Sequence, residues 1–586
     1  MKLILIADHK QRLKLAQRGV RTLAKRAGKG EQLSPAERLK LKQLDGEAKR
    51  LETIINAEND VALFAYEYFS DERNLDNAAG NFITNGEGGE PHESIEEMAP
   101  IHRDMYDISD EITTKVKGKY AICCPRGHAK TTVLSTILAL HEIVYQKRKY
   151  VLVLSETDTL SKRILTAIST QLKHNAKLRR DFGELLNPIS TKNEVDNENN
   201  FITSAKQLVE ASSSGKALRG KTHLGNRPDL IIADDLSSMN NEATEQQREK
   251  LIDWWNTTIT PLGSRNCATV IVGTKVTATG LLATLLTKRE YKSVTYSAII
   301  NGPDNPDLWS DYLHLYNSDA PQAEVDAFYN EHQAEMESGI ELSWPRRWTY
   351  RALMHEKATI GSRAFASEYL NESFAEDEQF FKMDRFGYCR RVFDNSMYAD
   401  AVYYNGKYYY LHDMILTLAY DPALGESKRA DLNAYVLIGK HKESGYYFVL
   451  DTFAKRCAPS EFMEAIINKA LERRIHNIAL EGIGAYRLLE DELRDRLRHA
   501  RLYSTRLSTI KSHGKQSKQA RIESLEVPLE NKTLILNEHE TELLSEMRYY
   551  PMPGNKVDVI DALSMAYETA TKKAPIKIIP KPDWLY

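Results

Sequence analysis

The segment PRGHAKTT, residues 125–132, has the composition of a phosphate-binding loop and follows the apolar run YAICC. Such a loop needs inward-facing backbone N–H groups, a lysine for the β- and γ-phosphates and a hydroxyl group for Mg²⁺. Lys130 and Thr131 supply the last two. The pattern is degenerate, because Cys124 and Ala129 stand at the glycine positions of GxxxxGK[ST], so an ordinary strand–turn–helix junction is an alternative. The loop residues that we expect around ATP are Pro125, Arg126, Gly127, His128, Ala129, Lys130, Thr131 and Thr132.

Two adjacent carboxylates follow further along the chain, in the run DLIIADDLSS at residues 229–238. An apolar strand that ends in aspartate brings this side chain to the carboxyl edge of a sheet, where it can hold Mg²⁺ beside the loop. The next acidic residue can then polarise the attacking water. We therefore assign Asp234, with Thr131, to the metal and Asp235 to the water. The apolar run TVIVGT at 269–274 follows in turn, and this order favours an ATP site over an acidic strand-to-loop junction.

A second group of carboxylates lies in the carboxyl-terminal part of the chain. Asp421 follows LTLAY and Glu481 ends IHNIAL, so each stands near the end of an apolar strand. In KVDVIDALSMA, Asp558 and Asp561 are three residues apart and share one face at the start of a helix. Such carboxylates can hold two divalent ions, Mg²⁺ or Mn²⁺, about 3.5–4 Å apart, which activate a water and stabilise the leaving oxygen. Taken singly, they could instead be a turn former, a surface charge and an N-cap.

The segments around the predicted ATP-site residues indicate an α/β domain. Short apolar runs alternate with helical stretches and are bounded by glycine, polar or charged residues, as buried parallel strands are. These runs are residues 120–124, 150–155, 230–233 and 269–273. We expect a P-loop ATPase domain of the RecA/ASCE-like class at residues 58–372.

The second group requires a different sheet. Three closely spaced strand patterns, joined by short polar connections, predict antiparallel neighbours, and a helix and a fourth strand follow them. The four strands are residues 414–420, 434–441, 446–453 and 475–482. This is the RNase-H-like order, in which strands one and four are neighbours, so that Asp421 and Glu481 converge. We place a linker at 373–410, this nuclease domain at 411–572 and a flexible tail at 573–586.

Composition limits the remaining possibilities. A chain of 586 residues can bury more than one core, and its net charge of -3 does not by itself indicate nucleic acid. The five cysteines form no CxxC pair, and no stretch approaches the roughly 18 apolar residues that a membrane span needs. Residues 1–57 carry 14 Lys/Arg against 6 Asp/Glu and predict a basic helical hairpin, with Ser34 and Pro35 opening its second helix. A solvated surface, DNA and a protein partner all remain possible for it.

The stretch RLSTIKSHGKQSKQARIESL, residues 506–525, is polar and basic. Lys518 and Arg521 are three residues apart on a predicted helix and could contact the DNA backbone by charge, although a solvated face is an alternative. His513 could be a ligand of an ion or a water, but a lone histidine in a loop usually is not.

The motifs PRGHAKTT, RGKT (219–222), RPDLIIADD (227–235) and VIVGTK (270–275) resemble the ATPase signatures of the large terminases of tailed bacteriophages. The carboxyl-terminal pattern is similar to their nuclease, with Asp on the first strand, Glu on the fourth and D-x-x-D-A-L on the last helix. By this resemblance Arg126 would act in cis on the γ-phosphate, and Gly273 with Thr274 would sense hydrolysis. Arg219 could alternatively reach the nucleotide of a neighbouring subunit.

The resemblance implies a DNA-packaging motor subunit that hydrolyses ATP to translocate double-stranded DNA into a procapsid and that cleaves concatemeric DNA. The implied partners are double-stranded DNA, the portal protein of the procapsid and a small terminase subunit, with a ring forming on docking. The expected location is the host cell cytoplasm, away from membranes. Two other hypotheses are a helicase- or transposase-like ATPase–nuclease acting on cellular DNA, and an inactive scaffold that binds DNA or a portal.

Overall fold

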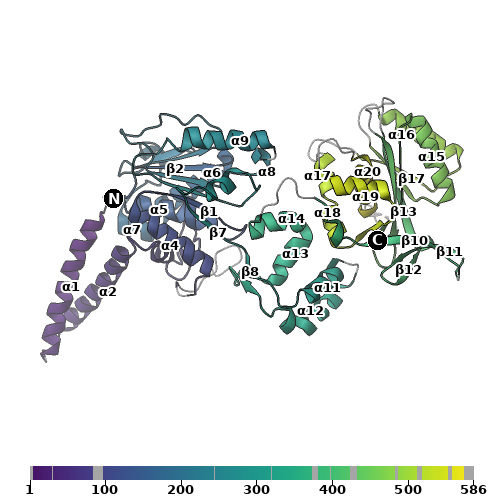
Figure 1. Cartoon of the computed structure of the whole chain (residues 1–586). Helices are drawn as coiled ribbons and strands as arrows, with labels where there is room; N and C mark the ends of the chain where they lie inside the picture. The colour runs from purple at the N-terminus through teal and green to yellow at the C-terminus, as the bar shows by residue number, and fades with distance from the viewer. Residues whose placement is uncertain are drawn as a thin grey trace, which may run out of the picture. The chain divides into compact units, whose positions relative to one another are not determined.

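The computed structural model describes most of the chain and divides it into two compact units (Figure 1). The described residues are 4–29, 31–83, 95, 97–242, 244–317, 320–372, 380–395, 397–422, 432–481, 486–510, 518–551 and 557–572. The first unit comprises residues 1–302, 339–353 and 363–375, and the second comprises residues 303–338, 354–362 and 376–586.

Two helices at the amino terminus, α1 (Ile6–Gly28) and α2 (Pro35–Asn56), pack against one another as a hairpin. Ser34 caps α2, because its hydroxyl accepts a hydrogen bond from the backbone N–H of Glu37 and the Glu37 carboxylate accepts one from the N–H of Ser34. Pro35 begins the helix at a position where a backbone N–H would have no partner. This reciprocal cap starts a second helix directly after the short break in the chain.

Seven strands form the sheet of the first unit, in the order β3-β4-β2-β5-β6-β1-β7. Only the pair β3 and β4 is antiparallel. The strand β6 separates β1, which leads into the phosphate-loop sequence, from β5, which ends in the acidic pair. This is the RecA/ASCE-like P-loop arrangement. The strands are β1 (Gly118–Cys123), β2 (Tyr150–Ser155), β3 (Asn200–Ile202), β4 (Leu208–Ser213), β5 (Leu230–Asp234), β6 (Ala268–Gly273) and β7 (Lys292–Thr295).

Helices cover both faces of this sheet, which explains why its central strands are apolar along their whole length. One face packs on α3 (Val61–Phe69), α4 (Pro100–Lys115), η1 (Thr131–Ile137), α5 (Leu138–Val144) and α6 (Asp158–His174). The other face packs on α9 (Glu245–Trp254), η3 (Trp255–Ile259) and α10 (Leu281–Leu286). Further elements are α7 (Ala176–Phe182), α8 (Met239–Glu242), β8 (Ile299–Asn301), β9 (Glu341–Leu342), α14 (Ser362–Phe365) and η4 (Ala366–Leu370).

The second unit is built on a nine-stranded sheet with the order β12-β11-β10-β18-β15-β14-β13-β16-β17. Strands β13, β14 and β15 are antiparallel neighbours, whereas β16 runs parallel to β13 and β17 parallel to β16. This is the RNase-H-like order, and the fold class predicted from the sequence is confirmed. The strands are β10 (Tyr388–Asp394), β11 (Ala399–Tyr404), β12 (Lys407–Tyr410), β13 (Met414–Asp421), β14 (Asn433–His441), β15 (Tyr447–Lys455), β16 (Asn477–Glu481), β17 (Arg506–Ile510) and β18 (Leu534–Asn537).

Helices also pack on both faces of the second sheet. Side chains of α15 (Pro459–Glu472) and α16 (Tyr486–His499) join the core on one face. The other face is covered by α17 (Lys518–Glu523), α18 (Glu526–Glu530), α19 (Thr541–Tyr549) and α20 (Asp558–Thr571). Further helices are α11 (Pro306–Asn317), α12 (Gln322–Met336) and α13 (Tyr350–Ile360). None of the helices that the structure describes is both long and apolar enough to cross a bilayer.

The boundaries between the parts differ from those predicted. Residues 373–410 were expected to form a linker, but residues 388–410 contain β10, β11 and β12, an antiparallel extension that joins the second sheet through β18. The aromatic and β-branched residues of YCRRVFD and ADAVYY favour strands once an edge is present for them to pair with. In addition, residues 303–338 and 354–362 group with the second unit. The predicted tail at 573–586 lies outside the described residues.

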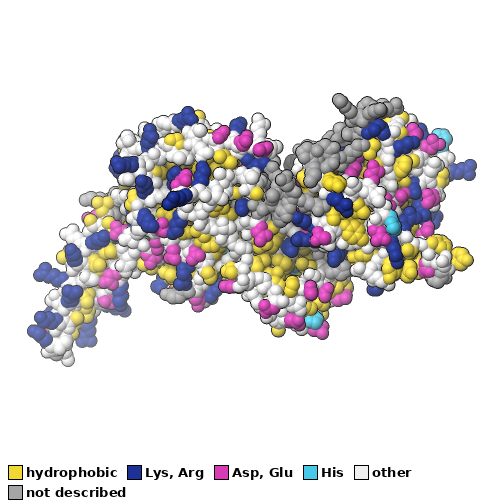
Figure 2. Space-filling model, viewed as in Figure 1, with side chains coloured by type: hydrophobic (Ala, Val, Ile, Leu, Met, Phe, Trp, Pro, Cys, Tyr) yellow, Lys and Arg dark blue, Asp and Glu magenta, His cyan; other side chains and the backbone are white. Residues whose placement is uncertain are grey.

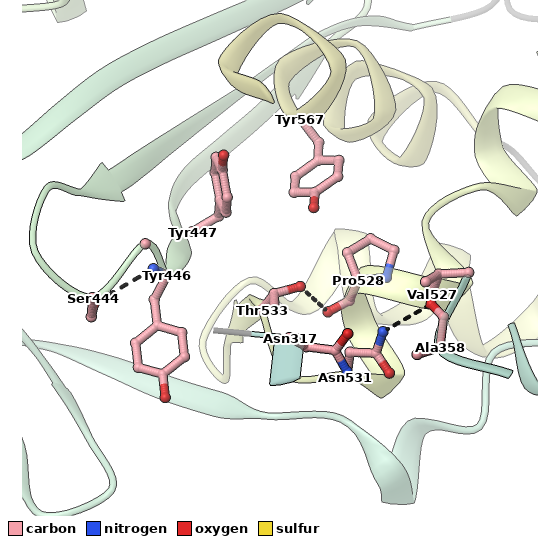
Figure 3. A pocket seen from close by; sticks show the side chains of 11 residues that line it. Asn317, Ala358, Ser444, Tyr446, Tyr447, Val527, Pro528, Asn531, Thr533 and Tyr567 are labelled. Carbon is pink, nitrogen blue, oxygen red and sulfur yellow. Dashed lines mark hydrogen bonds between the residues drawn. The ribbon is translucent and has the colours of Figure 1, made fainter. Parts of the chain in front are cut away.

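A cavity of about 270 Å³ lies in the second unit (Figure 3). The turn that contains Ser444, Tyr446 and Tyr447 lines one side of it, and Tyr567 of α20 also contributes. Two hydrogen bonds, from Thr533 to the Pro528 carbonyl and from Asn531 to the Ala358 carbonyl, already use polar groups of the wall. Because no charged side chain lines the cavity, it lacks the groups that either predicted reaction needs.

Candidate functional site

The phosphate-loop sequence forms a tight turn between β1 and η1. Gly127 and Ala129 both have positive φ angles, 69° and 62°. This left-handed region costs a non-glycine residue roughly 1–2 kcal/mol. Ala129 therefore adopts the conformation for which glycine is usual at this position of the motif. The backbone keeps the shape of a phosphate-binding loop although neither glycine position of the motif holds glycine.

Lys130, at the end of this loop, is buried and points at the acidic pair that ends β5. Its Nζ lies 3.2 Å from Oδ2 of Asp235. Although burial works against it, the charges of Asp235 and Asp234 raise the pKa of Lys130 above its usual value. The lysine is thus held as a cation at the carboxyl edge of the sheet, where parallel α/β folds bind their ligands.

Asp234 is held by two hydroxyl groups of η1. Thr131 donates a hydrogen bond of 3.1 Å to its Oδ1, and Ser135 donates one of 2.7 Å to its Oδ2. Burial and the nearby charge of Asp235 raise the pKa of Asp234 to about 6, although Lys130 and the two hydroxyl groups oppose this shift. Ser135 was missed by the sequence reasoning, because only its position one helical turn beyond Thr131 relates it to the motif.

Besides its ion pair with Lys130, Asp235 is held by its backbone. Its φ is 45°, its N–H donates to the carbonyl of Val272, and its own carbonyl accepts from the N–H of Glu156. A Cβ atom at Gly273 would lie 3.3 Å from Oδ1 of Asp235, so this close approach favours glycine. The side chain of Asp235 remains 43% exposed, and a water could reach it. Thr274, which follows Gly273, is buried.

His128 is a second feature of the loop that its sequence did not reveal. The ring is buried, stacks on Trp348 with an interplanar angle of 14°, and lies edge-on to Trp344. Its Nδ1 lies 2.9 Å from the carbonyl of Arg126, while burial lowers its pKa to about 4. The neutral imidazole therefore packs the loop against the two tryptophan rings. Pattern reasoning could not find Trp344 and Trp348, because they are far away in sequence.

The remaining predicted nucleotide residues lie around the same loop. Pro125 is buried, Thr132 is half-buried in η1, and Arg126 is exposed, with its backbone N–H bonded to the carbonyl of Glu368. Arg219 is also exposed, and it donates to the carbonyl of Thr257. Both arginines are therefore exposed near the surface of the first unit.

In the second unit, the strand register brings two predicted carboxylates together. Tyr420 of β13 pairs with Leu480 of β16 in a parallel register, and the next residues along these strands are Asp421 and Glu481. The backbone therefore sets these two at adjacent positions at the same end of the sheet. Asp421 is buried. The side chain of Glu481 lies outside the described part of the structure, as does all of His513.

The amino-terminal end of α20 supplies the other two carboxylates. Both are buried, because α20 packs on β13 and β14. Oδ2 of Asp558 accepts a hydrogen bond of 3.0 Å from the N–H of Leu432. Asp561 is 1% exposed and accepts two hydrogen bonds, of 2.9 and 2.8 Å, from the guanidinium of Arg521. The sequence left Arg521 either a contact with DNA or a solvated position, and in the structure it instead neutralises Asp561.

Lys518 lies among these carboxylates. Its Nζ is 3.3 Å from Asp421, 3.7 Å from Asp558 and 3.2 Å from Asp561. Their charges raise the pKa of Lys518 above its usual value, against the effect of burial. For Lys518 the sequence also allowed either DNA contact or a solvated face. In the structure it occupies the position of a cation bound by three carboxylates.

Glu546 of α19 is a further buried carboxyl group near this end of α20. Its Oε2 accepts hydrogen bonds of 3.0 Å from the N–H groups of Val559 and Ile560. Burial raises its pKa to about 7. Because a carboxylate at a helix start satisfies free N–H groups, Glu546 fixes the end of α20 that carries Asp558.

The donor set fits hard divalent ions, since carboxylates converge on one cationic atom. Within the described residues no three Asp, Glu, His or Cys side chains are close enough to hold a metal by themselves. Asp421, Asp558 and Asp561 surround Lys518 instead, and the Glu481 side chain would have to complete the set. In contrast, Asp451 faces away, bonded to Tyr435 and Lys469.

Together the strand orders and side chains define a class of protein, one that joins a P-loop fold with an acidic pair to an RNase-H-like fold with clustered carboxylates. No protein-family model matches the chain, and no curated protein matches it.

Among solved structures, it is similar to the large terminase of a thermophilic bacteriophage in complex with ADP, at 8% identity over 80% of this chain and 98% of that one, with a TM-score of 0.36. It is also similar to the large terminase of bacteriophage HK97, at 14% identity over 87% and 99% of the chains, with a TM-score of 0.31. A third similar structure is the large terminase nuclease of thermophilic phage G20c with bound magnesium, at 13% identity over 33% and 98%, with a TM-score of 0.24.

Proposed function

We propose that this chain is a large terminase, the subunit that hydrolyses ATP to move double-stranded DNA into a procapsid and that cuts concatemeric DNA. The observation that carries the proposal is the presence of two separate acidic sites in one chain. Lys130 and Asp234 mark the first, in the P-loop fold, and Asp421 and Asp558 mark the second, in the RNase-H-like fold. A nucleotide-hydrolysing site and a metal-dependent nuclease site in one chain are what nucleotide-driven DNA processing needs.

In the ATP site, Lys130 would bind the β- and γ-phosphates and release Asp235 from its ion pair. Loop N–H groups from Gly127 to Thr131 would hold the phosphates, and Asp235 would then be free to orient the attacking water and accept its proton. Magnesium, when bound, would neutralise charge on the phosphate oxygens. Thr131 and Asp234 would hold it, and their hydrogen bond already places both groups within reach of one ion.

The arginine that acts on the γ-phosphate is proposed to be Arg126. Arg126 is part of the loop and its side chain is exposed, and a cation near the equatorial phosphate oxygens accelerates phosphoryl transfer. Gly273 and Thr274 would sense hydrolysis, because the side chain of Asp235 lies so near Gly273 that an added Cβ atom would be 3.3 Å from its Oδ1. Arg219 remains the alternative, acting on the nucleotide of a neighbouring subunit.

In the nuclease site, Asp421, Glu481 and Asp558 would hold two divalent ions, Mg²⁺ or Mn²⁺. These ions would supply an activated water and stabilise the leaving oxygen. Asp561 was also predicted as a ligand. Its two hydrogen bonds to Arg521 support a different role, in which Asp561 positions α20 and leaves Asp558 as the direct ligand.

The proposed partners are double-stranded DNA, the portal protein of a procapsid and a small terminase subunit, with a ring forming on docking in the host cell cytoplasm. A helicase- or transposase-like enzyme is the second candidate. It is disfavoured because the described residues contain a single P-loop sheet, whereas a helicase that works as a monomer would need two.

Translocation of DNA into purified empty capsids, with and without ATP, tests the motor function directly. The proposal requires ATP-dependent protection of the DNA from added nuclease. A purified chain that hydrolyses ATP and cuts DNA with divalent ions, but never fills capsids, would favour the helicase- or transposase-like alternative. A chain with neither activity would be an inactive scaffold.

A further inference from the structure

The position of Lys518 raises the question of what balances the nuclease carboxylates when no metal ion is bound. Asp421, Asp558 and Asp561 are all buried, and their mutual repulsion would be costly without a cation. Arg521 donates two hydrogen bonds to Asp561. The one described cation that approaches all three carboxylates is Lys518, with distances of 3.2 to 3.7 Å.

We infer that Lys518 is an internal counter-ion that occupies the nuclease site in the metal-free protein and leaves when divalent ions enter. The inference rests on the proposed nuclease function, and it adds a residue that sets metal affinity. Lys518 and the ions are alternatives, because the same carboxylate oxygens bind both.

The structure distinguishes a cation that can leave from one that stays. Arg521 is 7% exposed and binds one carboxylate through two hydrogen bonds, which fixes its planar head. The side chain of Lys518 is 44% exposed and begins α17, and its ammonium sits on a flexible four-carbon stem. Lys518 can therefore swing into solvent while Arg521 continues to hold Asp561.

Removing this ammonium has two opposite consequences. Divalent ions bind more tightly, because they no longer displace a cation. Breaking three partly screened ion pairs costs the wild type at least about a tenfold loss in metal affinity, which the variant avoids. The metal-free protein becomes less stable, because two buried carboxylates lose their nearest positive charge. A residue that only packed in place would not produce both effects.

The test is calorimetric titration of the nucleotide-free full chain with Mn²⁺, comparing wild type with Lys518→Met and Lys518→Arg. We expect at least about tenfold tighter binding for Lys518→Met and near wild-type binding for Lys518→Arg, which keeps the charge. The matched control is Lys469→Met, since Lys469 pairs with Asp451 on the other face of the same sheet and should not alter the affinity. Asp421→Asn identifies the signal of this site by removing it.

Thermal unfolding in EDTA gives the second measurement. Lys518→Met should unfold at a lower temperature than wild type, and saturating Mn²⁺ should abolish the difference. Unchanged or weaker Mn²⁺ binding in Lys518→Met, or equal metal-free stability, would overturn the inference. Failure of the nuclease proposal looks different: DNA would stay uncut with Mn²⁺ bound, whereas the stability difference in EDTA would persist.

A second, independent inference concerns the amino-terminal hairpin, over which Lys and Arg side chains gather in Figure 2. Lys14, Arg18, Arg21 and Lys25 are exposed and lie on one face of α1, and together with Gln17 and Thr22 they line a shallow groove. We call these four residues the α1 cation stripe. At 3.6 residues per turn, they point away from the buried positions His9, Ala16 and Leu23 of the same helix.

The four stripe residues have no acidic partner among the described residues. Lys40 and Lys42 of α2 also form no ion pair with a described residue, but two residues apart they do not lie on one helix face, whereas the stripe forms a row. Several other cations of the hairpin are paired, for example Lys10 with Glu58, Arg12 with Glu47, and Arg26 with Glu31 and Glu37. A row of unpaired charges spaced along one helix face matches a polyanion that repeats its charge along an axis.

We propose that the α1 cation stripe binds the phosphate backbone of duplex DNA, without reading sequence. This rests on DNA as a partner in the proposed function and adds a contact surface outside both catalytic sites. Each phosphate contact should contribute about 0.9 to the slope of log K against log salt concentration. Two neutralised cations should therefore lower the slope by about 1.8.

Fluorescence anisotropy with a labelled duplex and the full chain in EDTA, over a salt series, measures this slope. Arg18→Gln with Arg21→Gln should lower it, whereas the charge-matched control Lys40→Gln with Lys42→Gln, on α2, should leave it unchanged. An equal slope in the stripe variant and wild type would overturn the proposal. If that variant also failed to fill capsids, the stripe would instead bind an acidic protein. Loss of all DNA binding in wild type would refute the proposed function itself.

Discussion

The two aspartates at the start of α20 should respond in opposite ways when each is changed to asparagine. Asp561→Asn leaves the guanidinium of Arg521 facing an amide in a buried site, and removing one partner of a buried ion pair costs about 3–5 kcal/mol. Asp558→Asn keeps an oxygen that can accept from Leu432 and removes a repulsive charge, so its cost should be below about 1 kcal/mol. We therefore expect Asp561→Asn to lower the free energy of unfolding more than Asp558→Asn does.

Activity should follow the reverse order. Asp558 is the proposed direct ligand, so Asp558→Asn should lower cleavage by more than about 100-fold, the upper end of what loss of a supporting residue costs. Asp561→Asn should lower it by about 10–100-fold, through the position of α20. The assays are urea unfolding in EDTA and nicking of supercoiled plasmid with Mn²⁺, and Asp451→Asn is the control for both.

One result would refute this reasoning. If Asp561→Asn were as stable as wild type and yet lost more cleavage than Asp558→Asn, the Arg521 pair would not hold the helix and Asp561 would be the metal ligand. Equal loss in both variants without destabilisation would mean that both carboxylates bind the ions.

Three further outcomes are expected. Lys130→Ala should abolish ATP turnover, measured as phosphate release, while plasmid nicking continues; turnover at the wild-type rate would end the nucleotide assignment. Asp235→Asn should keep nucleotide binding and slow hydrolysis severely, and lost binding with residual turnover would show that its role and that of Asp234 are exchanged. Burial raises the pKa of Asp110 to about 6, so this group binds its proton more tightly when folded, and its contribution to stability should fall as pH rises from about 4 to about 6. Allowing for solvent screening, Asp110→Asn should remove roughly 1–2 kcal/mol of this dependence in urea unfolding at several pH values.

The sequence was sufficient for the strands of both sheets, because buried strands need apolar runs whose ends are marked by polar residues. The runs before Lys130, Asp234 and Asp421 are of this kind, and the structure makes each a strand that ends near the predicted residue. The strands at 388–410 were missed because their apolar and polar residues are mixed, and they become strands by pairing at the sheet edge. The pattern of apolar and polar residues within a segment does not indicate whether a sheet edge is available for it to pair with.

The sequence by itself determined which residues stand at the ends of strands and at the starts of helices. These boundaries depend on residues that are neighbours along the chain. Only the tertiary structure decided which charges neutralise one another. From the sequence, Lys518 and Arg521 could face either DNA or solvent, but the packing of α17 beside α20 turns them toward Asp421 and Asp561. In the same way, Ser135 reaches Asp234 because η1 packs on β5. An ion pair depends on distances of a few ångströms between distant segments, and spacing along the chain carries no information about those distances.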